Sequence, residues 1–350
     1  MKKIKLSIAV DNEKCNRQLP GGGFVWKGYE FIINQSCEEA DFWVVYSKGK
    51  HETESCRVAP ENTLFITGEP DSVYHYSKGY VKQFAKVLSC QDHLKHKNLV
   101  KSQPAQPWHI GKLTKRIVGA RGEESVAAEY SHNYDDLKVS KPQKTKLISV
   151  ITSNRAFTKG HRERIDFVMK LKEHYGDQLD MFGWGFNGFE DKWDVIAPYK
   201  YHIAIENNSI PYYWTEKLAD SYLGNAFPIY YGATNVGEYF SKDAFLAIDI
   251  HDVEGAIKII DKAIADDLVE KNAAAIEDAK QLVLDKYNLF NLIVEQIQEM
   301  NPNAPKKDYT IKHDMAFFDW KKFYIMGWKR IMNTIQSRVS IQLLFRWSKI

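Results

Sequence analysis

Short runs of apolar, β-branched and aromatic residues recur along the first 250 residues, and turn-forming residues separate them. Such runs predict buried strands, which we expect at 42–46, 63–67, 84–90, 147–152, 179–182, 201–206 and 226–231. Amphipathic stretches between them, clearest at 161–175 and 215–223, predict helices. Parallel sheets covered by helices have this alternating order, so we predict an α/β fold.

The length of the chain and one polar segment predict two domains. A chain of 350 residues exceeds the usual size of a single domain. The basic segment 137–146, which contains a proline, has the composition of an interdomain linker. We therefore assign residues 1–140 to an N-terminal domain and residues 147–300 to a second domain that ends in a long helical region. Residues 301–350 begin with the helix-breaking sequence NPNAP and are predicted to form a helical tail.

Charge is distributed unevenly along the chain. The formal net charge is only +3, which argues against a nucleic-acid partner. The segment 311–350 nevertheless holds eight Lys and Arg residues against two Asp residues. Aromatic residues alternate with these cations, a pattern typical of helices that lie on membranes. Within residues 317–350 we expect both packing and binding: 317–328 packs back on the N-terminal domain, and the part beyond residue 330 binds an anionic membrane surface.

The cysteines and the N-terminus predict the cellular compartment. All four cysteines lie in the first 90 residues without a C-x-x-C pair, which indicates reduced thiols. A lysine at position 5 interrupts the first apolar run, so we expect no secretory signal, and no apolar stretch reaches the roughly 20 residues that span a bilayer. These features predict a cytoplasmic protein, attached peripherally to the inner face of the membrane by its tail.

Candidate chemistry is concentrated after the strand predicted at 201–206. This strand ends at Glu206, and Thr215 has the character of a helix N-cap. A helix that starts beside the carboxyl ends of parallel strands directs its free amide groups at an anion. Lys217 adds a cation there, and Glu216 is placed to accept hydrogen bonds from ribose hydroxyls. An acid in the first helical turn is also common for capping alone, but a lysine there opposes the helix dipole unless an anion binds.

The diphosphate of such a ligand would be neutralised by cations of the protein. No D-x-D occurs in the chain, so we expect no essential metal or other cofactor. Arg162 and Arg164, which follow the strand at 147–152, supply suitable charge, although such a cluster is often a solvated helix face. In the N-terminal half, Glu69 follows the strand at 63–67. It is either an exposed turn residue or a base that deprotonates an acceptor hydroxyl across the cleft.

Several coupled motifs resemble one known family. The segments YKYHIAIENN (199–208), YYWTEK (212–217) and AFPIYYGATNV (226–236) resemble the signature of the family 10 glycosyltransferases, the α-1,3/4-fucosyltransferases. The resemblance extends to TGE (67–69) and LDMFGWGFNG (179–188). It departs from the family at Ile205, where phenylalanine is frequent, and at Trp214, where a small β-branched residue is common. Both positions lie near the donor site, so the identity of the transferred sugar stays open.

The resemblance implies a fold, a reaction and a set of site residues. The fold is the GT-B architecture, in which two Rossmann-like domains face each other across a cleft. The reaction is inverting transfer of fucose from GDP-fucose, without an essential metal, to O3 of an N-acetylglucosamine or glucose unit. By resemblance, Glu69 is the general base, Arg164 or its neighbour Arg162 contacts the diphosphate, Tyr213, Glu216 and Lys217 hold the nucleotide, and Glu206 and Asn207 belong to the donor pocket.

The acceptor class and two alternatives complete this hypothesis. We expect an oligosaccharide or glycolipid precursor as acceptor, in the synthesis of lipopolysaccharide or another surface glycan. Trp26, Tyr74, His75, Tyr76 and Trp108 offer stacking surfaces for sugar rings, although such aromatics are as often part of a core. One alternative is the same fold with another nucleotide sugar. The other is a non-catalytic relative that binds sugars or membranes.

Two further motifs are explained without new function. GWGFNG (183–188) satisfies G-x-G-x-x-G, but the residues after it do not predict the helix that a dinucleotide site requires. Cys90, His93 and His96 have the spacing of metal ligands, but no fourth ligand is evident, and we expect no metal there.

Overall fold

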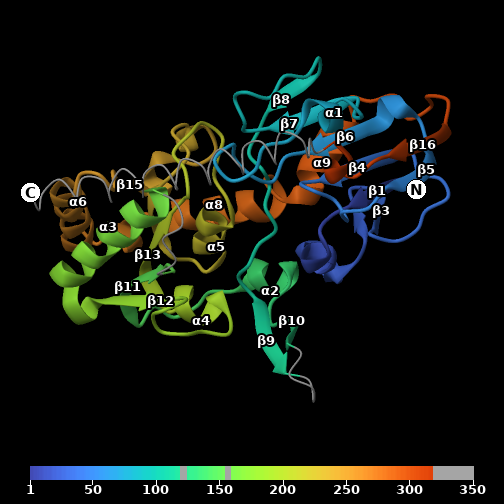
Figure 1. Cartoon of the computed structure of the whole chain (residues 1–350). Coiled ribbons are helices and arrows are strands. Elements are labelled where there is room, and N and C mark those ends of the chain that lie inside the picture. The colour runs from blue at the N-terminus through green and yellow to red at the C-terminus, as the bar shows by residue number, and fades with distance from the viewer. Residues whose placement is uncertain (119–123, 154–158, 318–350) are drawn as a thin grey trace, which may run out of the picture.

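Two parallel β-sheets, built from different halves of the chain, form the protein (Figure 1). The computed structural model describes residues 1–118, 124–153 and 159–317. The predicted α/β class is correct. All seven strands expected from the apolar runs are present; those at 42–46 and 179–182 have the predicted bounds, and the other five have shifted ends.

The first sheet has seven strands. In spatial order they are β2 (Val25–Trp26), β3 (Tyr29–Ile33), β1 (Lys2–Ser7), β4 (Phe42–Tyr46), β6 (Thr63–Ile66), β7 (Lys86–Ser89) and β8 (Leu99–Lys101). All neighbours are parallel except the antiparallel pair β2–β3. Every residue of β4 and β6 is buried, because central strands of a parallel sheet are covered on both faces.

The second sheet has five parallel strands. Their order is β12 (Leu179–Phe182), β11 (Lys146–Ile151), β13 (Tyr199–Ile205), β14 (Phe227–Tyr231) and β15 (Leu246–Ala247). The helices of this half are α3 (Lys159–Tyr175), α4 (Lys192–Ile196), α5 (Glu216–Leu223), α6 (Val253–Ala265), α7 (Leu268–Lys271) and α8 (Ala273–Asp285). Residues of α3 and α6 share a core with Ile203 of β13, whereas Ala204 faces the other core with α5 and α8.

Shorter elements complete the described chain. They are β5 (Glu54–Val58), the hairpin β9 (Lys112–Val118) and β10 (Glu124–Tyr130), α1 (Lys78–Val81), α2 (Tyr134–Val139), α9 (Leu289–Ile297) and β16 (Lys307–Ile311). Short stretches of 3₁₀ helix lie at Val10–Gln18, Pro20–Gly22, Pro60–Asn62, Gly176–Gln178, Val236–Glu238, Lys242–Ala244 and Asp314–Phe317.

The end of the described chain returns to the first sheet, as the orange and red segments of Figure 1 show. The ring of Phe290 in α9 lies 4.8 Å from that of Phe31 in β3. Strand β16 pairs with β5, and its Ile311 is buried in the first domain. The first domain therefore includes α9, which the sequence analysis assigns to the second, and residues 307–311, which it assigns to a helical tail. Tyr309 and Ile311, two residues apart, both pack toward the first domain, as alternate residues of a strand do.

The segment predicted as a linker is only partly one. Residues 137–139 form the end of α2. The segment that then connects the two sheets is fixed by Lys144, whose Nζ donates hydrogen bonds to the carbonyls of Ala197 (2.7 Å) and Gly224 (2.8 Å). One hydrophobic core also contains residues of both domains, among them Ile110 and Leu218. The two sheets are therefore joined by packing as well as by the chain.

The predicted membrane-binding tail lies almost entirely outside the described residues, since 318–350 are not among them. At its start, the ring of Phe317 lies 6.3 Å from that of Tyr80 in the first domain. Within the described part of the chain, no helix combines the length and apolarity needed to cross a membrane.

Candidate functional site

The start of helix α5 is fixed by a buried carboxylate. Glu206, the residue after β13, is 2 % exposed, and its Oε1 accepts a hydrogen bond from the Thr215 amide at 2.8 Å. The Thr215 hydroxyl lies 2.8 Å from Glu206 Oε2 and caps α5 by accepting from the Lys217 amide. The predicted N-cap is confirmed. The loop 207–214 is thus closed by one side chain, which holds the helix start at the carboxyl edge of the sheet.

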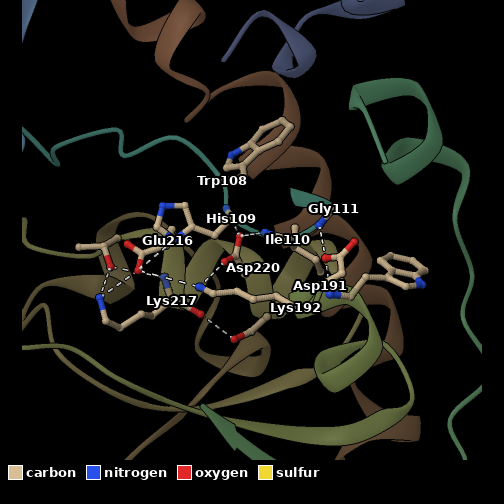
Figure 2. A network of polar contacts seen from close by, with 12 residues as sticks. Trp108, His109, Ile110, Gly111, Asp191, Lys192, Glu216, Lys217 and Asp220 are labelled. Carbon is tan, nitrogen blue, oxygen red and sulfur yellow. Dashed lines mark hydrogen bonds and ion pairs between the residues drawn. The ribbon is translucent and has the colours of Figure 1, made fainter. Parts of the chain in front are cut away.

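A compact charge cluster surrounds this helix start (Figure 2). Lys217 Nζ lies 3.1 Å from Glu216 Oε1 and 3.3 Å from Glu206 Oε2. Lys192, from α4, reaches Asp220 Oδ2 at 2.7 Å and Glu216 Oε1 at 4.0 Å. The predicted residues Glu206, Glu216 and Lys217 are therefore in direct contact.

The charge states in the cluster follow from its geometry. Burial alone would raise the pKa of Glu216, but the cations of Lys217 and Lys192, with His109, outweigh it and hold this pKa well below its usual range. Burial raises the pKa of Glu206, which Lys217 only partly opposes. For Lys217, burial would lower the pKa, but both carboxylates outweigh it, and the pKa is raised. Lys217 therefore stays charged.

A segment of the first domain covers α5. As Figure 2 shows, residues 108–111 run above the helix, and the amides of His109 and Ile110 both donate to Asp220 Oδ1 at 3.1 Å. The Gly111 amide donates to Asp191 Oδ1 at 2.8 Å. Burial lowers the pKa of His109 to about 4, so its ring is neutral at pH 7. No local pattern in the sequence indicates these contacts, because His109 and Asp220 lie 111 residues apart.

These elements enclose a cavity of about 350 Å³, which is lined by Thr152, Arg164, Glu216 and Lys217, among others. Thr152 Oγ1, Arg164 Nε and Glu216 Oε2 are buried and have no hydrogen-bond partner among the described residues. An unpaired buried polar atom costs about 1–3 kcal/mol, so these atoms are suited to a polar ligand. A neighbouring cavity of about 610 Å³, lined by Trp184, Phe186 and Phe189, shares His109 and Lys192 with the first.

One glycine permits the close approach that shapes this cavity. Gly183 has a φ of +116°, and a Cβ atom there would lie 2.0 Å from the carbonyl oxygen of Thr152. At Gly188, in the same motif, an added Cβ atom would meet nothing within 4 Å. The motif GWGFNG is followed by a loop, and the next helix is the five-residue α4. As expected, no long helix follows these glycines to form a dinucleotide site.

The two predicted arginines differ in position. Arg164 lines the cavity, and its Nη1 donates to Asn207 Oδ1 at 2.9 Å. Arg162 is exposed and is not among the lining residues. Of the two alternatives for a diphosphate contact, Arg164 therefore has the suitable geometry.

Tyr213 is buried. Its burial, and then the charge of Glu206, raise the pKa of its hydroxyl.

The charges of this cluster act on Glu69 in the first domain. Burial, together with the carboxylates of Glu216 and Glu206, raises its pKa to about 7, while Lys217 opposes the shift. The loops of the two domains also touch, since Asn208 Nδ2 lies 3.2 Å from Ser72 Oγ. A carboxyl group with a pKa near 7 is suited to general-base catalysis.

Several other candidates are accounted for by packing. Trp26, Tyr76 and Trp108 are buried in the first domain's cores and offer no open stacking surface. Cys90 is also buried, which raises the pKa of its thiol to about 12. His96 has both ring nitrogens near backbone groups, at 3.0 and 3.1 Å. Cys90, His93 and His96 therefore do not form a common ligand set.

Residues 141–264, which contain this charge cluster, match the C-terminal part of glycosyltransferase family 10 (fucosyltransferase). Over these residues the chain is similar to the family 10 glycosyltransferases. Over 77 residues, it is 31 % identical to alpha-(1,3)-fucosyltransferase FucT of Helicobacter pylori. This alignment covers 22 % of the chain and 16 % of the relative's length.

One solved structure resembles most of this fold, and a second is similar with a lower score. An alpha-glucosyltransferase in complex with UDP matches with a TM-score of 0.51 at 8 % identity, over 85 % of this chain and 100 % of that one. An alpha1,3-fucosyltransferase with GDP matches at 16 % identity and a TM-score of 0.45, over 82 % and 92 % of the two chains. The fold is the GT-B architecture that the sequence resemblance implied.

Proposed function

We propose that the protein is an inverting fucosyltransferase, which moves fucose from GDP-fucose to O3 of an N-acetylglucosamine or glucose unit. The observation that carries the proposal is the cavity at the start of α5. It combines unpaired polar atoms with cations, and the charges of its Glu216 and Lys217 act on Glu69, a carboxyl group whose pKa is about 7. The similarity of residues 141–264 to family 10 supports fucose as the sugar.

In this proposal, the cavity binds the nucleotide and its diphosphate. Arg164 Nε and the Lys217 ammonium donate to phosphate oxygens. Glu216 Oε2 accepts a hydrogen bond from a ribose hydroxyl. Binding therefore pairs two of the buried atoms that have no partner among the described residues. Asn207 orients Arg164 through their 2.9 Å hydrogen bond.

The transfer step needs one base and stabilisation of one leaving group. Glu69 accepts the proton of the acceptor hydroxyl as that oxygen attacks the anomeric carbon from the face opposite the diphosphate. The bond between this carbon and the diphosphate oxygen breaks, and its electron pair leaves with GDP. Arg164 and Lys217 stabilise the added charge. Attack from the opposite face inverts the configuration at the anomeric carbon.

GDP release tests this proposal. We expect release from GDP-fucose to rise when N-acetyllactosamine is added, and the Glu69→Gln variant to lose this acceptor-dependent part. Glu61→Gln, which changes an exposed glutamate of the same domain, is the matched control and should keep full activity. Full turnover by Glu69→Gln would refute the role of Glu69 as the base.

Two alternatives are separated by the same assay. Ile205 and Trp214 depart from the family pattern near the donor, so a panel of nucleotide sugars tests whether another donor is used. Release from a different donor would replace fucose in the proposal. Binding of GDP without release from any donor would favour a non-catalytic sugar-binding protein.

We further propose that the acceptor is an oligosaccharide or a glycolipid precursor of a surface glycan, reached in the cytoplasm at the inner membrane face. The basic and aromatic composition of residues 317–350 supports this location. Flotation with vesicles that contain anionic lipid tests it. We expect the full chain to float and a chain ending at residue 317 to remain in solution, and equal behaviour would refute membrane binding by the tail.

A further inference from the structure

Three metal-binding side chains converge on the surface of the first domain. Asp71, His75 and His93 each offer a ligand atom, and these atoms all lie within 4.8 Å of one another. The rings of His75 and His93 stack with centroids 4.0 Å apart and an angle of 20° between their planes. His93 Nδ1 also contacts Asp71 Oδ1 directly. The sequence spacing pointed to His93 with Cys90 and His96, whereas the fold gives His93 two different neighbours.

The three residues come from two loops that are already fixed to each other. Asp71 and His75 follow β6, and His93 follows β7. Gln91 bridges the two loops, because its Nε2 donates to the carbonyls of Glu69 at 2.7 Å and Tyr74 at 2.8 Å. The backbone therefore brings the ligands together without the help of an ion, as a preorganised site requires.

We propose that Asp71, His75 and His93 bind a divalent transition-metal ion, with Zn²⁺ as the representative. Two imidazoles and one carboxylate are ligands that zinc prefers, whereas Mg²⁺ and Ca²⁺ prefer oxygen ligands alone. Zinc–ligand bonds of about 2.0–2.1 Å place tetrahedral ligands roughly 3.4 Å apart. The lone pairs of stacked rings run nearly parallel, so at least one imidazole must turn about its side-chain torsions for both nitrogens to reach one ion.

The surroundings agree with an ion that keeps open positions. The side chains of His93 and Asp71 are 34 % and 37 % exposed, so water has access to complete the coordination. An ion pair between His93 and Asp71 explains one contact without a metal. It does not account for His75, whose ring stacks on that of His93.

The three ligands are different residues from those assigned to sugar transfer. The metal proposal and the proposed function can therefore each fail alone.

Titration of tag-free full-length protein with Zn²⁺ tests the site, after dialysis against a chelator. Calorimetry should show one saturable site per chain, and Co²⁺ should give visible absorption of a site with nitrogen ligands. His75→Ala and His93→Ala should each weaken Zn²⁺ binding by more than about tenfold. His51→Ala, which removes a histidine with 53 % exposure from the same domain, should leave the affinity unchanged.

The possible outcomes decide the proposal. Loss of the site in both ligand variants, with unchanged circular dichroism and an unchanged control, supports it. Equal binding by all four proteins would mean that zinc binds elsewhere, and no saturable binding by the wild type would mean that the three residues form an ion pair only. Either result overturns the assignment. Saturation by Mg²⁺ with equal affinity would overturn the class of metal.

Discussion

Replacement of Lys217 by methionine separates the two roles of this residue, in stability and in anion binding. The change leaves the buried carboxylates of Glu206 and Glu216 without their nearest cation, at 3.3 and 3.1 Å in the native protein. Breaking a buried ion pair from one side costs about 3–5 kcal/mol. Because a quarter of the Lys217 side chain is exposed, we expect the lower end, about 3 kcal/mol. For a domain of this size, that lowers the melting temperature by about 6–12 °C.

A second variant distinguishes lost stability from lost binding. Lys217→Met combined with Glu206→Gln removes one negative charge together with the positive one. The glutamine still offers an oxygen to the Thr215 amide, so we expect the double variant to regain most of the lost stability. It has no ammonium group for the diphosphate, so GDP affinity should remain low.

Thermal unfolding with and without GDP measures both effects. GDP at one hundred times its dissociation constant should stabilise the wild type by about 2.7 kcal/mol. It should stabilise neither variant to a comparable degree at the same concentration. The reasoning would be refuted if Lys217→Met melted at the wild-type temperature, or if GDP raised the melting temperature of the double variant as much as that of the wild type.

Three further predictions concern the cleft. Because Glu69 must be ionised to accept a proton and its pKa is about 7, kcat/KM should fall about tenfold per pH unit below pH 7 and level off above it; a flat profile from pH 5 to 8 would contradict this. Gly183→Ala should destabilise the protein and weaken GDP binding in calorimetry, whereas Gly188→Ala should change neither. The Asp220 carboxylate accepts hydrogen bonds from two backbone amides, and Asp220→Asn replaces it with a neutral amide group. This variant should melt several degrees lower; an unchanged melting temperature would show that these contacts contribute little.

Local patterns predicted the part of the site that is local in the chain. Glu206 follows the strand and Thr215 caps the helix. The two residues lie nine positions apart, and the hydrogen bond between them closes one short loop. Apolar runs and capping residues report such short-range structure directly. Glu216 and Lys217 were assigned to one site because both lie in the first turn of this helix.

Contacts between distant segments could not be predicted in this way. The amide of His109 meets Asp220 only because a segment of the first domain crosses α5. Likewise, residues 307–311 were predicted as part of a helical tail, but their pairing with β5 makes them a strand. Ser55 and Thr310, which pair across these strands, are 255 residues apart, and such pairing leaves no trace in local periodicity.

Because α9 and β16 pack back on the first domain, they determine where the chain must be cut to exchange a domain with a related protein. A chimera that takes its first domain from another chain, with a single junction near residue 140, would pair a foreign sheet with the native α9 and β16. The Phe31–Phe290 contact and the β5–β16 pairing would then combine side chains that did not evolve together. A successful exchange needs two junctions, one near residue 140 and one just before residue 289.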